Sequence, residues 1–246
     1  MQILDEKSKT LFKNRSVHIC YDDADHDIKS NATRQSIISL VDTAASMSNI
    51  SHKDFVILDA GCGIGILMRD LKKAGFSKIV GVDFDEKCIS MAKRYANAKL
   101  VSLDNLDNEF DVRSVDMVIL SHVLEHMPNP IDILKRVKRI SRRWLILAVP
   151  NPIRPKILAK YAMRSKNYSN LGHLYSWDRS HFHIFLERHN RLRIIKWATD
   201  DVRVIPFAAF RRLLQKAKVL DLIELRLLPR WFPYFSSSLI TLCEVR

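Results

Sequence analysis

The sequence predicts an α/β fold with a doubly wound, mostly parallel sheet of seven strands and helices on both faces. Three observations lead to this fold class. Short apolar runs typical of buried strands alternate with helically periodic stretches along residues 33–150. The first run ends in Asp59 and in glycines at 61, 63 and 65, as expected at a sharp strand-to-helix turn. The chain of 246 residues also suits one such domain with a full core.

The N-terminal part is predicted to contain an irregular arm followed by a helix. Residues 1–32 mix charges with isolated apolar side chains and show no sustained period, so we interpret them as an arm or lid. From Thr33 onward apolar residues recur at the spacing of one helix face, with Ile37, Val41 and Ala44 among them. A helix is therefore expected before the first strand.

The central part is predicted to alternate between strands and helices. Gly75 is placed as a C-terminal cap for the helix after the glycine turn, and Asp85 is placed as an N-terminal cap for the next helix. A further helix is expected over residues 131–140. The expected strands are residues 55–58, 78–82, 98–103, 115–121 and 143–149.

After Pro150 this rhythm breaks. Proline and a polar stretch rich in histidine and aromatic residues make a segment too long for a simple connection, so an insertion after strand five is predicted at about 151–190. Residues 191–246 are expected to supply the closing strands. The elements expected in this half are helices near 155–165 and 181–190, a strand near 193–200, a helical region at 207–226 and a strand near 237–245.

The composition limits the location and the partners of the chain. Cysteines are few and lack paired metal spacing, and neither a secretory leader nor an apolar run of ~20 residues is evident. A cytoplasmic protein is expected, with peripheral membrane contact as an option. Of the net charge of +13, residues 1–150 carry 22 basic and 20 acidic side chains, and residues 151–246 carry 18 and 7. The basic C-terminal part favours an anionic partner.

The ends of the first four predicted strands define a candidate ligand site. In open α/β sheets ligands bind beyond the carboxyl ends of the strands, so Asp59, Asp83, Asp104, Ser121 and His122 should line one crevice. A carboxylate about 20 positions after a glycine turn suits the two hydroxyls of a ribose, and Asp83 has this spacing.

A dinucleotide is disfavoured as the ligand. Its fingerprint requires Gly-x-Gly-x-x-Gly, whereas Ile66 stands where the third glycine would fall. Phe84, directly after Asp83, could still pack on a purine.

These residues resemble those of the class I S-adenosylmethionine-dependent methyltransferases, which have a Rossmann-like sheet, and in particular the group that methylates small and lipid-like molecules. The resemblance covers residues 33–150 well and the remainder weakly. It is carried by residues 57–65 (Ile-Leu-Asp-Ala-Gly-Cys-Gly-Ile-Gly), residues 80–83 (Val-Gly-Val-Asp), Asp104 and residues 116–127 with their Val-Leu-Glu-His core.

The resemblance implies a cofactor half at 33–150, an acceptor side in the insertion and S-adenosyl-L-methionine as cofactor. The glycine turn would face the methionine part, Asp83 would hold the ribose, and Asp104 with its neighbours would contact the adenine. Ser121 and His122 would flank the reacting methyl group, and His122 is the candidate general base. The cofactor-binding residues expected on this basis are Asp59, Gly61, Cys62, Gly63, Gly65, Asp83, Phe84, Asp104, Asn105 and Ser121.

No metal site is expected from the histidines. Residues 122–126 match the His-x-x-Glu-His pattern of some zinc proteases, but here the motif follows a buried strand and meets Met127-Pro128 instead of lying within a long helix. Histidines and aromatic residues of the insertion are expected to shape an acceptor pocket, and the substrate candidates are His181, His183 and Tyr175.

The acceptor is the least determined part of the function. The end of strand four lacks the Asn/Asp-Pro-Pro-aromatic signature of enzymes that methylate base amines, which weakens a nucleic-acid acceptor. Residues 226–235 combine aromatic residues, prolines and two arginines, which suits a membrane interface. A small or lipid-linked, anionic acceptor is therefore expected. The alternatives are an RNA methyltransferase that uses the basic C-terminal part, an NAD(P)-dependent oxidoreductase and a nonenzymatic anion-binding protein.

Overall fold

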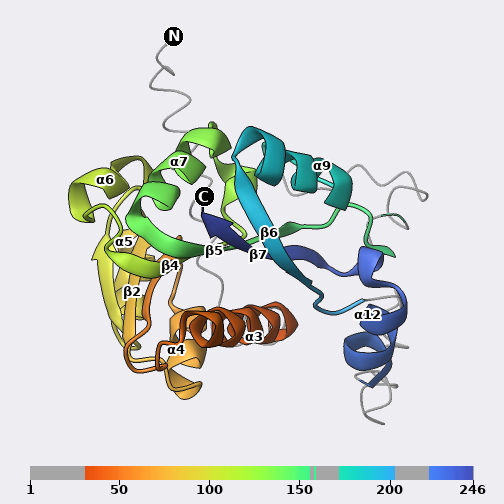
Figure 1. Cartoon of the computed structure of the whole chain (residues 1–246), viewed down its shortest axis with the longest axis horizontal. Helices are drawn as coiled ribbons and strands as arrows, with labels where there is room; N and C mark the ends of the chain where they lie inside the picture. Colours follow the sequence, from red (N-terminus) through yellow and green to blue (C-terminus); the bar gives the residue numbers. More distant parts are fainter. Residues whose placement is uncertain (1–30, 156–157, 159–171, 203–221, 246) are drawn as a thin grey trace.

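A computed structural model describes residues 31–155, 158, 172–202 and 222–245 (Figure 1). Its centre is one sheet of seven strands in the order β3-β2-β1-β4-β5-β7-β6. The first five strands of the sequence pair in parallel, and β7 runs antiparallel to both of its neighbours. The predicted fold class is thereby confirmed. The strands are β1 (Val56–Ala60), β2 (Lys78–Asp83), β3 (Asn97–Leu100), β4 (Val115–Ser121), β5 (Ser141–Pro150), β6 (Leu192–Ala198) and β7 (Ser238–Val245).

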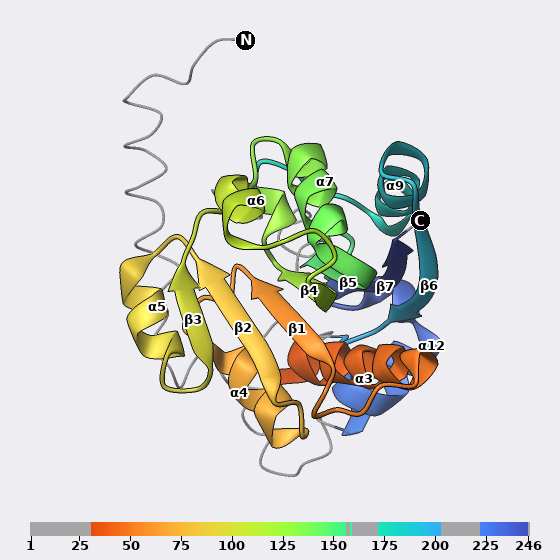
Figure 2. The same ribbon diagram turned by 60° about the vertical axis from the view of Figure 1, so that its left-hand side comes forward.

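Helices cover both faces of the sheet (Figures 1 and 2). Ile57 and Met117 pack into one core with α3 (Asn31–Ser48), α4 (Ile66–Lys73) and α5 (Glu86–Ala92). Their chain neighbours Leu58 and Val118 pack into a second core, which α6 (Leu106–Glu109), α7 (Pro130–Ile140) and α9 (Arg179–Ile184) cover. This alternation follows from the two-residue period of a strand, and both faces are apolar because both are covered.

The third strand is shorter than predicted. It ends at Leu100, after which the Val101 amide still donates to the Asp83 carbonyl at 2.9 Å. The Ser102 hydroxyl then accepts from the amide of Asp104 and caps a 3-10 turn, η1 (Leu103–Asn105). A side-chain cap therefore replaces the end of the predicted strand.

The elements after β5 can be compared with the sequence pattern only at the described residues. The predicted helix near 181–190 is α9 followed by a π-helical turn, η3 (Phe185–His189). The end of the region expected at 207–226 is a second π-helical turn, η4 (Ile223–Leu227), which leads into α12 (Leu228–Trp231) and the 3-10 turn η5 (Pro233–Phe235). The predicted arm up to residue 30 and most of the predicted helices at 155–165 and 207–226 lie outside the described residues.

A buried carboxylate joins the two ends of the described chain. Asp200 accepts a hydrogen bond from the Thr33 hydroxyl at 2.8 Å and another from the Ser238 amide at 3.0 Å. It thereby connects the first turn of α3 to the first residue of β7. Burial raises the pKa of this carboxyl group, whereas the two donors lower it.

We expect the substitution Asp200→Ala to lower the free energy of unfolding by about 2–3 kcal/mol, because it leaves two buried donors without their acceptor. Urea denaturation followed by circular dichroism measures this change. Asp54→Ala is the matched control, because the Asp54 carboxylate contacts Ser51 and Lys78 at an exposed site. Equal midpoints for the two variants would contradict the structural role of Asp200.

Candidate active site

The glycine turn after β1 is held against the end of β2. The amides of Gly61 and Cys62 both donate to the Val82 carbonyl, at 2.8 and 2.9 Å. The amide of Gly63 donates to the carboxylate of Asp83 at 2.9 Å. All three glycines of the turn have positive φ, at 84°, 52° and 84° in chain order. The sequence places glycine here because this backbone conformation is unfavourable for side chains with a Cβ.

The three glycines have different surroundings. A Cβ on Gly61 would lie 2.5 Å from Cγ2 of Val123, and one on Gly65 would lie 2.9 Å from Cα of Ala92. A Cβ on Gly63 would have no described atom within 4 Å. Gly61 and Gly65 therefore permit close packing of the turn, whereas Gly63 borders open space where a ligand could approach the backbone.

Two carboxylates lie at the base of this turn. Asp59 is buried, and its Oδ2 atom has no hydrogen-bond partner among the described residues. Burial, with a smaller contribution from the charge of Asp83, raises the pKa of Asp59 to about 7. Burial also raises the pKa of Asp83, against the hydrogen bonds from the amides of Asp85 and Gly63. A cationic or donor-bearing ligand would compensate both groups.

The remaining predicted cofactor residues border the same ends of the strands. Phe84 follows β2 with 53% of its surface exposed, and Asp104 and Asn105 are exposed in η1 after β3. Ser121 ends β4 and is partly exposed. Cys62 lies within the turn, and burial strongly raises the pKa of its thiol, so this sulfur is held in the neutral form.

His122 has a constrained conformation at the end of β4. Its φ of 57° is unusual for a residue with a side chain, and its amide donates to the Ala148 carbonyl of β5 at 2.8 Å. Its Nε2 atom lies 3.2 Å from the Ser238 hydroxyl, and its Nδ1 atom lies 3.4 Å from Oε1 of Glu125. Backbone strain of this kind is concentrated at functional sites.

Of the three substrate candidates, contacts bring only Tyr175 to the end of β4. Its amide donates to the Glu125 carbonyl, and its hydroxyl donates to the Pro128 carbonyl at 3.0 Å. His181 instead contacts Asp178 at 2.7 Å, and His183 contacts Glu187 at 3.3 Å. These two histidines are exposed, and their described contacts are local to α9 and η3.

Two residues near the site were not singled out by sequence reasoning. Glu125 is 1% exposed in the 3-10 turn η2 (Leu124–His126). Val123, one residue before η2, fills the space above Gly61. The His-x-x-Glu-His pattern contained a signal for Glu125, but its burial is set by the tertiary structure.

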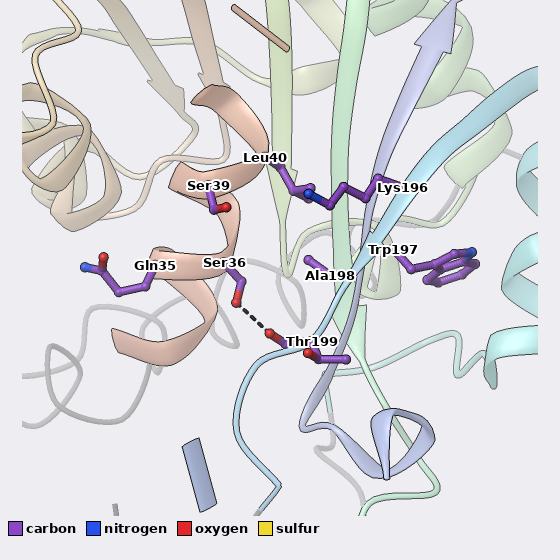
Figure 3. Close-up of a pocket in the computed structure, with 8 residues that line it drawn as sticks. All are labelled: Gln35, Ser36, Ser39, Leu40, Lys196, Trp197, Ala198 and Thr199. Atoms are coloured by element: carbon purple, nitrogen blue, oxygen red, sulfur yellow. Dashed lines mark hydrogen bonds between the residues drawn. The ribbon is translucent and has the colours of Figure 1, made fainter. Parts of the chain in front are cut away.

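A shallow pocket elsewhere contains none of the predicted site residues. It lies between α3 and β6 at the far edge of the sheet, where the Ser36 hydroxyl donates to the Thr199 carbonyl at 2.7 Å (Figure 3). Trp197 points away from α3 in this view. The residues that line the pocket are Gln35, Ser36, Ser39, Leu40, Lys196, Trp197, Ala198 and Thr199.

The sheet order, the glycine turn and the carboxylates at the strand ends together define a class I S-adenosylmethionine-dependent methyltransferase. Residues 29–192 match the family described as methyltransferase domain, and the chain belongs to this family. S-adenosylmethionine is accordingly its cofactor.

Solved structures support the fold over nearly the whole chain. The magnesium protoporphyrin IX methyltransferase of Synechocystis PCC 6803, with bound S-adenosylhomocysteine, aligns with a TM-score of 0.61 and 18% identity. The alignment covers 96% of this chain and 95% of that chain. A plantazolicin methyltransferase bound to a substrate analogue and S-adenosylhomocysteine aligns with a TM-score of 0.59 and 18% identity, over 91% of this chain and 88% of that chain.

Curated relatives match a shorter segment. The ubiquinone biosynthesis O-methyltransferase of Hahella chejuensis is 30% identical over 92 residues, which are 35% of this chain and 38% of the relative. The ubiquinone biosynthesis O-methyltransferase of Coxiella burnetii is 31% identical over 91 residues, which are again 35% of this chain and 38% of the relative. The match thus spans less than two fifths of the length of these relatives.

The residues present fit the cofactor. The open space beside Gly63 would admit it, and the unpartnered oxygen of Asp59 could accept a hydrogen bond from its ammonium group. The exposed ring of Phe84 suits stacking with an adenine.

We expect the substitution Asp59→Asn to raise the melting temperature of the ligand-free protein at pH 8. The folded-state pKa of about 7 lies above the ordinary value of 3.8, so ionised Asp59 destabilises the fold. This penalty is complete above pH 7 and disappears as the pH falls towards 4, so the difference between variant and wild type should shrink over that range. Scanning calorimetry of both proteins at several pH values measures it. A difference independent of pH would contradict the raised pKa.

Proposed function

We propose that this chain is an O-methyltransferase that acts on a small or lipid-linked, anionic acceptor. The observation that carries the donor side is the hydrogen bond from the Gly63 amide to Asp83, together with the Oδ2 atom of Asp59, which accepts no hydrogen bond from the residues that the structure describes. Transfer to oxygen is supported by the O-methyltransferases that match a third of the chain.

In this proposal each predicted residue has a distinct part in binding the cofactor. Asp59 and the turn formed by Gly61, Cys62, Gly63 and Gly65 face the methionine part, and Asp83 accepts hydrogen bonds from the ribose. Phe84, Asp104 and Asn105 surround the adenine, and Ser121 lies beside the transferred methyl group. The cofactor supplies an activated methyl group and its own leaving group when bound.

The chain itself has little chemistry to perform in such a reaction. It must hold the acceptor oxygen in line with the methyl group and exclude water, and it must take a proton if the acceptor is a hydroxyl. His122 is the proposed base. Its ring lies between Ser238 and Glu125, which fixes its orientation at the end of β4.

An exposed apolar surface supports an acceptor at a membrane. Within residues 222–234, Trp231 is 75% exposed and Tyr234 is 62% exposed, and Leu222, Leu225, Leu227 and Phe232 are each nearly half exposed. Arg226 and Arg230 lie in the same segment. Aromatic and basic side chains together favour the interface of an anionic membrane. In the described part of the chain, no helix has the length and apolarity needed to cross a membrane.

The donor side is tested by calorimetric titration of the full chain. We expect S-adenosylhomocysteine to bind and NAD(P) not to bind. The substitution Asp83→Ala should weaken the binding free energy by about 1–3 kcal/mol, because a hydrogen-bonding carboxylate is lost. Asp111→Ala, on an exposed turn, is the control. Binding of NAD(P), or an unchanged affinity of Asp83→Ala, would refute these assignments.

The membrane contact is tested by sedimentation with vesicles of phosphatidylcholine and phosphatidylserine. We expect binding that weakens with added salt, and a several-fold loss of binding when Trp231 and Phe232 are both replaced by serine. Met47→Ser is the control, because Met47 is an exposed apolar residue on α3. No salt-sensitive binding by the wild-type chain would remove the lipid version of the proposal.

A further inference from the structure

Glu125, His126 and His173 form a cluster of metal-ligating side chains beside the end of β4. One ligand atom from each residue lies within 4.8 Å of the other two. Glu125 and His126 belong to η2, and His173 comes from the segment that follows residue 171. The cluster is therefore assembled from two parts of the chain that are distant in sequence.

Backbone contacts hold these two parts together. The Glu125 carbonyl accepts hydrogen bonds from the amides of Leu174 and Tyr175, at 2.7 and 3.2 Å. The rings of His126 and His173 meet edge to face, with their centroids 4.9 Å apart. The position of His173 is thus fixed relative to η2.

The hydrogen bonding of His126 leaves one ring nitrogen free to act as a ligand. Its Nδ1 atom lies 3.0 Å from the Gly172 carbonyl, which can only accept, so Nδ1 carries the proton in this contact. In the neutral ring, Nε2 then presents a lone pair, 3.9 Å from Oε1 of Glu125. Metal-binding histidines commonly donate their other N–H to a carbonyl in this way.

The Glu125 carboxylate is buried without hydrogen bonds from the described residues, and Nδ1 of His122 lies 3.4 Å from its Oε1 atom. The side chain is 1% exposed, and neither carboxylate oxygen accepts a hydrogen bond from any described residue. A buried carboxylate without hydrogen bonds is costly, and here it also faces the lone pair of His126 Nε2. A cation between these groups would satisfy them together.

We propose that Glu125, His126 and His173 bind a divalent transition-metal ion such as Zn²⁺. Two imidazoles and one carboxylate favour this class of ion over Mg²⁺ and Ca²⁺, which prefer oxygen ligands. Three protein ligands leave at least one coordination position open. The proposal departs from the expectation, drawn from the sequence, that no metal is bound.

The open position gives the metal a role on the acceptor side, and this part rests on the proposed function. Glu125 lies four residues after Ser121 and three after His122, the two residues that flank the proposed position of the methyl group. A divalent ion there would bind an anionic oxygen of the acceptor as a Lewis acid.

Binding is measured by titrating Zn²⁺ into the full chain after treatment with a chelator, followed by calorimetry and thermal melting. We expect one equivalent to bind and to raise the melting temperature, with Mg²⁺ and Ca²⁺ much less effective. Glu125→Gln and His173→Ala should each weaken Zn²⁺ binding by at least about tenfold. His189→Ala is the matched control, because His189 is an exposed histidine at the end of η3.

The competing explanation is an ion pair between Glu125 and a protonated histidine. In that case Glu125→Gln should lower the melting temperature of the metal-free protein. In a metal site, the same variant should not lower it but should lose the Zn²⁺-induced rise. No Zn²⁺ binding by the wild type, or full binding by both variants, would overturn the proposal. Titration with S-adenosylhomocysteine separates the two hypotheses, because loss of metal binding with retained cofactor binding leaves the proposed function intact.

Discussion

The carboxylate of Asp83 is the group on which the rest of the site depends. It accepts the amide of Gly63 with one oxygen and the amide of Asp85 with the other. The first bond fixes the turn after β1, and the second directs the chain from β2 towards α5. Asp85 itself caps α5 through the amides of Lys87 and Cys88. The Asp83 side chain therefore contacts the backbone of two β–α units. Gly63, whose backbone is held to β2 in this way, borders open space.

This arrangement places two carboxylates in buried positions, where their ionisation is unfavourable. Asp59 and Asp83 lie near the ends of adjacent strands, and the charge of Asp83 adds to the cost that burial imposes on ionising Asp59. A site that stores this unfavourable energy in the free protein is selective for ligands that carry positive charge. The sulfonium and ammonium groups of S-adenosylmethionine fit that requirement, whereas a dinucleotide with its pyrophosphate does not.

The fold around the proposed donor side could be predicted from the sequence because it depends on local chemistry. The cap at Asp85 and the helical period of α7 each depend on residues close together in sequence. The spacing of Asp83 from the glycines depends on the parallel register of β1 and β2. The close approach of Val123 to Gly61 could not be predicted, since it depends on how β4 ends relative to β1. The contact of Glu125 with residues 174 and 175 could not be predicted either, because these residues are distant from it in sequence. The π-helical turns after α9 and before α12 have no local signature, and periodicity alone predicts ordinary helices there.

The position of β7 connects the exposed segment 222–234 to the end of β4, where His122 lies. This segment leads directly into β7, which lies between β5 and β6 and cannot shift without disturbing both. The side-chain Nδ2 of Asn151 donates to the carbonyls of Tyr234 and Ser236, each at 2.8 Å, and Ser238, the first residue of β7, contacts His122. The aromatic surface and the imidazole of His122 are therefore connected through a short series of hydrogen-bonded residues. If that surface binds a membrane as proposed, Asn151 and Ser238 are the residues through which its position would be transmitted to His122.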